Sequence, residues 1–236
     1  MSKHTVENKE IDLVITYSED HWKLLANKRC KAQQILDILS SISGDFGVYG
    51  SIARGDIHPS SDIDIIGFEL IQPYKMEYLL ENIEQTITDL RIVMATPNHS
   101  IKGVIQFDDE VSITFPLVKL NPREKEFYQF AGRLTKWTSF KDRIVGINKN
   151  LKLIEPLSNG HRERTIKLVP TPELLKFGFT QRIIEERKRV LYRRDKIGRT
   201  GIFLNHPVNM DDGFSLTLKA LVDRNPIVRR KVRGDK

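Results

Sequence analysis

The chain has 236 residues, of which 39% are hydrophobic and 29% are charged, and its formal net charge is +7 at pH 7. This length and balance are typical of one large or two modest globular domains and argue against a disordered chain. No apolar run approaches the ~18 residues of a membrane span, and no charged-then-apolar leader is present, so we expect a cytoplasmic protein without a membrane partner. A single cysteine, Cys30, excludes an internal disulfide.

The first half of the chain predicts helices alternating with strands. Ser18 can cap a helix over residues 19–40, whose leucines, isoleucine and alanine recur on one face. The periodicity then predicts a strand over 46–50, a strand over 62–68, a helix over 74–85, a strand over 90–94, and a hairpin over 104–117 with Asp108 and Asp109 in its turn. This pattern indicates a mixed α/β (α+β) fold in which a small mixed sheet is backed by helices.

The second half predicts a further helix over 123–130 and then a polar connector over 136–142, where we place a domain boundary. The domains expected are a core over 1–135 and a smaller C-terminal α+β or helical domain over 136–236. Within the latter we expect two short strands in 144–154, an amphipathic helix over 180–194, a Gly-rich turn in which Arg199 and Thr200 could bind phosphate, and a mobile basic tail over 229–236.

Positive charge is concentrated toward the C-terminus. Residues 161–236 carry 19 Lys/Arg and 9 Asp/Glu, a net charge of +10, whereas residues 1–160 carry 19 Lys/Arg and 22 Asp/Glu, a net charge of −3. A polyanion is attracted to such a region through phosphate neutralisation and counterion release. The helix over 180–194 is therefore either an ordinary solvated helix or a surface for RNA.

A polar, Gly-punctuated segment follows the first predicted strand. Gly50 allows a tight turn and close approach of a ligand, and Ser51 can cap a short helix that begins at Ile52. Successive backbone N–H groups at such a helix start form a donor site for phosphate oxygens. Arg54, three residues after Ser51, would lie on the same side and could hold a terminal phosphate before Gly55 ends the turn.

Two carboxylates open the next predicted strand. Asp62 and Asp64 alternate with Ile63 and Ile65, so both carboxylates point to one face of the strand while the isoleucines enter the core. At roughly 6 to 7 Å apart along a strand, the two charges repel unless a cation lies between them. Hard oxygen ligands of this kind suit Mg²⁺ or Mn²⁺ that also contacts triphosphate oxygens.

Together, Gly50-Ser51, Arg54-Gly55 and Asp62-Ile63-Asp64 resemble the signature of the DNA polymerase beta-like nucleotidyltransferase superfamily. The resemblance covers residues 45–68 and, by extension, a domain over 19–119. It implies a nucleotidyltransferase core and the metal-dependent transfer of a nucleoside monophosphate from a nucleoside triphosphate (NTP) to an acceptor hydroxyl. In this reading Asp62 and Asp64 bind the metal, and Ser51 and Arg54 hold the leaving pyrophosphate.

The resemblance also implies a third carboxylate on a later strand. The candidate strand runs over 110–116, where Ser112 or Thr114 stands in the expected acidic place. Either Glu110, on the same face, serves as the third catalytic and metal-binding carboxylate, or the site has only two carboxylates.

Three functions remain open at this point. The protein could be an active nucleotidyltransferase whose basic domain over 136–236 binds an RNA acceptor. It could instead transfer the nucleotide to a protein or a small molecule. The third alternative is a catalytically weak protein that binds nucleotide or RNA, because Ser112 replaces the third carboxylate.

Overall fold

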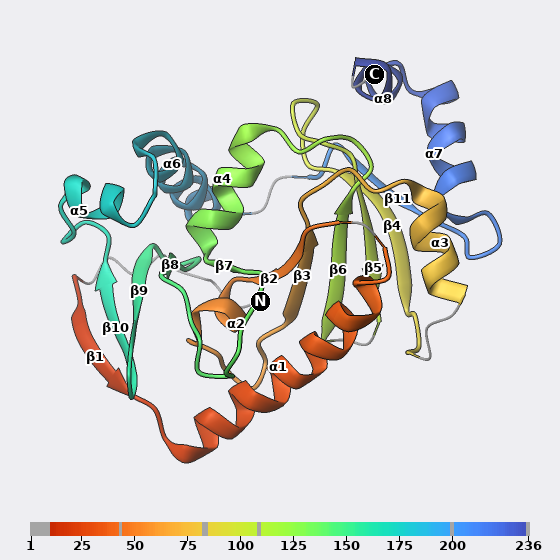
Figure 1. The fold of residues 1–236 in the computed structure, drawn as a ribbon. Helices are drawn as coiled ribbons and strands as arrows, with labels where there is room; N and C mark the ends of the chain where they lie inside the picture. The colour runs from red at the N-terminus through yellow and green to blue at the C-terminus, as the bar shows by residue number, and fades with distance from the viewer. Residues whose placement is uncertain (1–9, 43, 82–84, 108–109, 199–200, 235–236) are drawn as a thin grey trace. The chain divides into compact units, whose positions relative to one another are not determined.

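A computed structural model of the protein describes residues 10–42, 44–81, 85–107, 110–198 and 201–234 (Figure 1). The chain forms two compact units, each assembled from stretches that are separated in the sequence. The first unit comprises Met1–Arg29, Val48–Ser61 and Arg123–Gly201, and the second comprises Cys30–Gly47, Asp62–Pro122 and Ile202–Lys236. Within the described stretches, no helix is both long and apolar enough to cross a bilayer.

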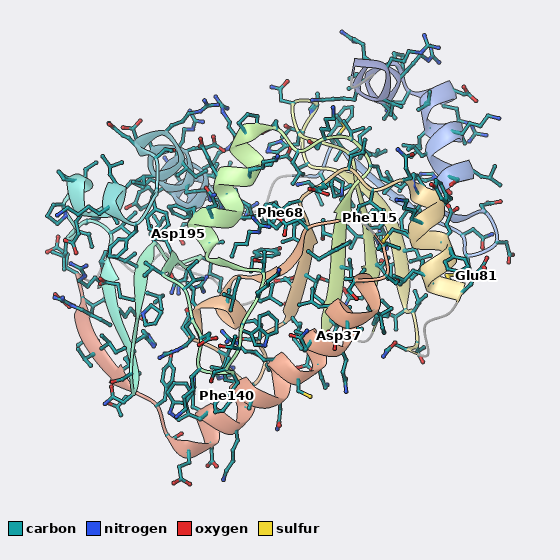
Figure 2. The ribbon with its side chains drawn as sticks, viewed as in Figure 1. Asp37, Phe68, Glu81, Phe115, Phe140 and Asp195 are labelled. Carbon is teal, nitrogen blue, oxygen red and sulfur yellow. The ribbon has the colours of Figure 1, made fainter. Side chains whose placement is uncertain are left out.

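The first unit contains an antiparallel sheet with the strand order β1-β10-β9-β8. Its strands are β1 (Asp12–Thr16), β8 (Gly146–Ile147), β9 (Lys152–Leu157) and β10 (Gly160–Thr165). A second antiparallel pairing joins the end of β2 (Phe46–Tyr49) to β7 (Arg133–Leu134). Phe140, labelled in Figure 2, lies between β7 and β8 and places its ring edge-on to Trp22, with the centroids 6.3 Å apart.

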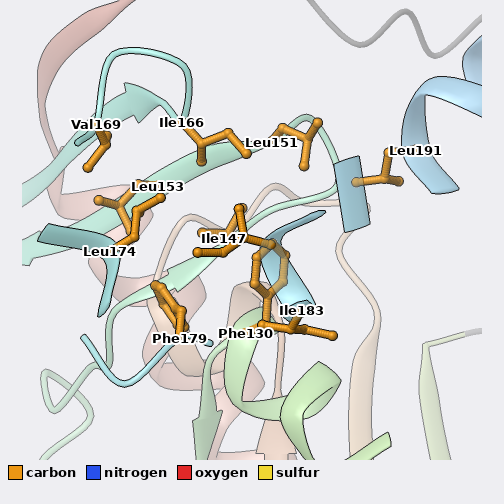
Figure 3. Packing of buried hydrophobic residues seen from close by; sticks show 11 residues of the cluster. Phe130, Ile147, Leu151, Leu153, Ile166, Val169, Leu174, Phe179, Ile183 and Leu191 are labelled. Atoms are coloured by element: carbon orange, nitrogen blue, oxygen red, sulfur yellow. The ribbon is translucent and has the colours of Figure 1, made fainter. Parts of the chain in front are cut away.

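Helices complete the first unit. They are the first part of α1 (Glu19–Leu39), α2 (Ser51–Arg54), α4 (Pro122–Ala131), α5 (Thr171–Lys176) and α6 (Gln181–Ile197). Apolar side chains from α4, α5, α6 and the sheet form one buried cluster (Figure 3). Its members are Phe130, Ile147, Leu151, Leu153, Ile166, Val169, Leu174, Phe179, Ile183, Ile184 and Leu191. This core fixes which side of α6 is buried and therefore which side faces solvent.

The second unit contains a mixed sheet with the strand order β11-β4-β5-β6-β3. The strands are β3 (Ile63–Gly67), β4 (Asp89–Met94), β5 (Lys102–Gln106), β6 (Val111–Pro116) and β11 (Leu204–Pro207), and the helices are the rest of α1, α3 (Pro73–Glu81), α7 (Gly213–Arg224) and α8 (Pro226–Gly234). β3 and β6 are parallel, whereas the other neighbours are antiparallel. Phe115 of β6 packs edge-on against Phe214 of α7, with centroids 5.0 Å apart.

The predicted fold class, a mixed α+β protein with a mixed sheet, is confirmed. The first helix, the paired carboxylate strand and the hairpin of β5 and β6 lie where the periodicity placed them. The predicted turn residues Asp108 and Asp109, and the candidate phosphate contacts Arg199 and Thr200, fall outside the described residues. The division into domains over 1–135 and 136–236 stays a prediction, while the compact units follow a different, interleaved partition.

The expectation of a mobile tail over 229–236 is wrong for the residues described, because residues 226–234 form α8. The carboxamide oxygen of Asn225 accepts hydrogen bonds from the backbone N–H groups of Ile227 (2.9 Å) and Val228 (3.3 Å). Pro226 supplies the preset backbone angle of a first helical residue. Val228 is fully buried, so apolar packing adds to the cap.

Replacing Asn225 by alanine removes this cap. We expect Asn225→Ala to lower the free energy of unfolding by about 1 kcal/mol and to speed amide exchange in residues 226–234. Urea unfolding and hydrogen exchange measure the two effects, with Arg224→Ala, at an exposed residue of α7, as the control. Unchanged exchange in α8 would contradict the assignment of Asn225 as its cap.

Candidate functional site

The turn between β2 and α2 depends on the conformation of two glycines. Gly50 has φ 77° and ψ −144°, and Gly55 has φ 94° and ψ −5°. A side chain at Gly50 would meet no atom within 4 Å, so the requirement there is conformational. At Gly55 a Cβ would also lie 2.4 Å from Cδ of Arg143. The glycines therefore allow a four-residue helix to begin and end abruptly.

The predicted helix start is shifted by one residue. Gly50 is the N-cap, Ser51 is the first helical residue, and no side chain caps this end, so the expectation that Ser51 caps the helix is wrong. The carbonyl of Gly50 accepts from the N–H groups of Ala53 (3.1 Å) and Arg54 (3.0 Å). Because the first N–H groups of a helix have no acceptor within it, the start of α2 presents donors that suit an anion.

Arg54 is buried in the first unit. Its Nε and Nη2 donate to the two carboxylate oxygens of Asp56 at 2.9 and 3.0 Å, and its Nη1 donates to the carbonyl of Ala131. This bidentate contact fixes the side chain against the protein. A role for Arg54 as a phosphate contact stays a prediction, and the contacts present assign it a positioning role for the turn.

Arg29 of α1 holds the other end of α2. Its Nε and Nη2 donate to the carbonyl of Ile52 at 3.1 and 2.8 Å, and Nη2 also donates to the carbonyl of Ala53 at 3.2 Å. Its Nη1 donates to the carbonyls of Phe140 (3.1 Å) and Asp142. The side chain is 1% exposed, and this burial, followed by the charge of Arg143, lowers the pKa of Arg29 to about 10.

A histidine adds a further contact to the same turn. A ring nitrogen of His21, Nε2, lies 2.8 Å from the carbonyl oxygen of Gly55. The His21 ring stacks on that of Tyr17, with centroids 3.7 Å apart. Sequence reasoning missed Arg29 and His21, because no local motif marks a residue whose partners are distant in the chain. It also missed Asp56, although its partner Arg54 is only two residues away and the Arg-Gly-Asp spacing was a signal for the pair.

The two predicted metal carboxylates lie at the start of β3 in the second unit. Ile63 and Ile65 are fully buried, while Asp62 is exposed and Asp64 is half-buried. The alternation predicted for this strand is therefore confirmed. Asp62 and Asp64 are placed on the face of the strand opposite to the isoleucines.

Asp64 has a hydroxyl neighbour on the adjacent strand. β3 and β6 pair in parallel with Asp64 opposite Ser112, whose Oγ donates to Asp64 Oδ1 at 3.0 Å. Burial raises the pKa of the Asp64 carboxyl above its ordinary value, the Ser112 hydrogen bond opposes this rise, and the charge of Asp62 adds to it. An unbound Asp64 carboxylate therefore destabilises the folded state.

Glu110 lies directly before β6, and its carboxylate accepts from Lys31 Nζ at 2.7 Å. Its backbone carbonyl accepts from the N–H of Ile63 at 2.7 Å. In the part of the chain that the structure covers, no three His, Cys, Asp or Glu side chains are grouped so that they could hold one metal ion. Glu110 as a third metal ligand stays a prediction.

The donors of Asp62 and Asp64 fit a hard divalent cation. Carboxylate oxygens are the ligands that Mg²⁺ and Mn²⁺ prefer, and Mg²⁺ sites in proteins often use only one or two carboxylates together with water and phosphate oxygens. The raised pKa of Asp64 fits the same assignment, since a bound cation would offset the charge that burial makes costly.

Residues 29–111 match the family model for a nucleotidyltransferase domain. The match confirms, over these residues, the resemblance to the polymerase beta-like superfamily. It contains each predicted site residue, namely Gly50, Ser51, Arg54, Gly55, Asp62, Asp64 and Glu110, and it ends one residue before Ser112. No curated protein and no solved structure matches the chain.

A test of the α2 anchor uses Arg29→Lys. The lysine ammonium cannot reach the carbonyls of Ile52, Phe140 and Asp142 together, so we expect a loss of about 2 to 3 kcal/mol in the free energy of unfolding. Arg162→Lys, at a solvent-accessible arginine paired with Asp12, is the matched control and should cost far less than Arg29→Lys, because exposed ion pairs contribute little to stability. Equal losses in urea unfolding would show that the buried carbonyl contacts are not what Arg29 contributes.

A second test concerns the cost of the Asp64 charge. In metal-free buffer at pH 7, Asp64→Asn should raise the free energy of unfolding by about 1 kcal/mol, because the amide is neutral and still accepts from Ser112. Since the folded pKa is raised above the unfolded value, wild-type stability is highest below the unfolded pKa and falls as pH rises through the folded pKa.

The difference in the free energy of unfolding between Asp64→Asn and the wild type should therefore shrink as pH falls toward about 4. Thermal unfolding across this pH range measures it, with Asp37→Asn, at an exposed residue of the same unit, as the control. A lower stability of Asp64→Asn at pH 7 would be the contrary result.

Proposed function

We propose that this protein, which carries a nucleotidyltransferase domain over residues 29–111, transfers a nucleoside monophosphate from an NTP to an acceptor hydroxyl. The observation that carries the proposal is the placement of Asp62 and Asp64 on one face at the start of β3, with buried isoleucines between and after them. Mg²⁺ or Mn²⁺ is the cofactor that this donor set supports.

Each group of candidate residues has a separate task in the proposed reaction. Asp62 and Asp64 would hold the metal, which when bound neutralises triphosphate charge and favours ionisation of the acceptor hydroxyl. Ser51 and the first N–H groups of α2 would bind phosphate oxygens, while Gly50 and Gly55 give the turn its shape. The acceptor oxygen bonds to the α-phosphorus, while the bond from the α-phosphorus to the oxygen that bridges to the β-phosphate breaks. Pyrophosphate then leaves, and the hydroxyl proton passes to water.

RNA is the acceptor that the charge distribution favours. The net charge of +10 over residues 161–236 supports binding of a polyanion, and the reaction would use the NTP supply of the cytoplasm. Transfer to a protein or a small molecule is the alternative, and it predicts weak dependence on salt.

A second candidate function, nucleotide binding with little turnover, is favoured by one specific contact. Ser112, which with Thr114 is one of the two residues in the place where the resemblance implies a third carboxylate, donates to Asp64. A hydroxyl cannot supply the negative charge of a carboxylate to a cation. If Glu110 does not substitute for it, the site holds its metal with two carboxylates only.

The experiment that tests the proposal follows α-labelled nucleotides, all four in turn, with Mg²⁺ or Mn²⁺, into total RNA and total protein. We expect label in RNA with wild-type protein and a loss of at least ~100-fold in Asp62→Asn/Asp64→Asn, because metal positioning is removed. Asp211→Asn, at an exposed carboxylate of the same unit, is the control. No label with any acceptor, beside intact metal-dependent NTP binding, would replace the proposal by the second candidate.

Two further variants in the same assay test whether Glu110 serves as a third metal-binding carboxylate. If the site uses two carboxylates, Ser112→Asp should raise the rate about tenfold and Glu110→Gln should leave it unchanged. If Glu110 is the third ligand, Glu110→Gln should instead abolish transfer.

A further inference from the structure

The solvent side of α6 carries a row of basic side chains, Arg182, Arg189, Arg193 and Lys196. At 3.6 residues per turn, these positions lie within an arc of about 60°. All four side chains are exposed, and none forms an ion pair with another residue in the described part of the chain. We call this surface the α6 basic row.

The opposite side of α6 fixes the direction in which the row points. Ile183, Ile184 and Leu191 are buried in the core of the first unit. Arg187 also turns inward, with its guanidinium carbon 4.8 Å from the centroid of the Phe127 ring, and burial lowers its pKa to about 10. The helix cannot rotate without exposing these groups, so the row stays in solvent.

Acidic neighbours offset only part of the charge of the row. Glu186 pairs with Arg123 of α4 at 3.7 Å, whereas Glu185, which accepts from the neutral amide of Gln181 at 2.8 Å, keeps its negative charge within one helical turn of Arg182 and Arg189. Asp195, labelled on α6 in Figure 2, lies outside the arc. Seven basic against three acidic side chains leave α6 with a net charge of +4, concentrated on its exposed side.

An aromatic ring borders the row. Tyr192 is 37% exposed and stands within one helical turn of Arg189 and Lys196. Lys167 Nζ lies 6.0 Å from the centroid of its ring. Cations at helical spacing beside an exposed aromatic face are the elements of a single-stranded nucleic-acid surface, in which phosphates contact the cations and a base stacks on the ring.

We infer that the α6 basic row and Tyr192 bind single-stranded RNA, with phosphates along the row and a base on Tyr192. The role of that RNA as the acceptor rests on the proposed function, whereas its binding does not. The row runs from Arg182 to Lys196, and these 14 steps of 1.5 Å give about 21 Å of helix, which is long enough for several consecutive phosphates.

The other basic helix, α8, provides a matched comparison. There Arg229 donates to the carbonyls of Val222 (2.9 Å) and Asp223, and Lys231 donates to the carbonyl of Asn98 (3.2 Å). Arg230 and Arg233 remain exposed. Removing these two charges changes the net charge of the protein as much as removing two from the α6 row.

The test measures fluorescence anisotropy of a labelled 12-nucleotide single-stranded RNA at several NaCl concentrations. For four phosphate contacts we expect log affinity to fall with log salt with a slope of about −3. Arg189→Gln/Arg193→Gln should weaken binding about tenfold or more and reduce the slope by about 1.4. Tyr192→Leu should weaken binding about tenfold with the slope unchanged.

Two variants serve as controls. Arg230→Gln/Arg233→Gln should bind RNA with the slope of the wild type. Asp62→Asn/Asp64→Asn should also bind normally, so a failure of catalysis is separated from a failure of binding. Wild-type affinity in the α6 variants, or an equal loss in the α8 variant, would overturn the inference.

Discussion

The guanidinium of Arg29 is the contact on which the geometry of the phosphate turn depends. It is buried among backbone carbonyls, so its charge is balanced by carbonyl dipoles at the C-terminal end of α2 and in residues 140–142. A helix of four residues has too few internal hydrogen bonds to persist alone. Arg29 supplies the missing constraint, and Arg54 and His21 fix the residues that follow.

The two units balance the charges of their candidate site residues differently. In the first unit, buried cations are matched by acceptors, as in the bidentate contact of Arg54 with Asp56. In the second unit, the Ser112 hydroxyl is the one donor to the Asp64 carboxylate among the described residues, and it opposes the cost of burial and the charge of Asp62. A structure selected only for stability would match this carboxylate with a cation of its own. Its incomplete compensation is expected where a ligand supplies the rest.

The elements predicted correctly from the sequence are those whose structure depends on neighbouring residues in the chain. The alternation around Asp62 and Asp64, the hairpin of β5 and β6, and the α1 helix follow from periodicity in the sequence. The helix α8 was missed because its many basic residues indicated a solvated tail. The two features that stabilise it, the Asn225 cap and the burial of Val228, are not evident from composition. Arg29 could not be identified, since its acceptors lie 23 residues away at Ile52 and 111 residues away at Phe140. The position of Ser112 became informative only when the β3–β6 register was known.

The interleaved segments of the two units have a consequence for how this protein can be divided. Each unit draws on three separate stretches of the chain, and the boundary between two of them falls inside α1 and another inside β2. A fragment ending near residue 135 would retain both carboxylates yet lose β8, β9 and β10 from one unit and β11 and α7 from the other. A single continuous segment therefore cannot encode either unit. A recombination event that transfers one intact unit to another protein must transfer almost the whole chain.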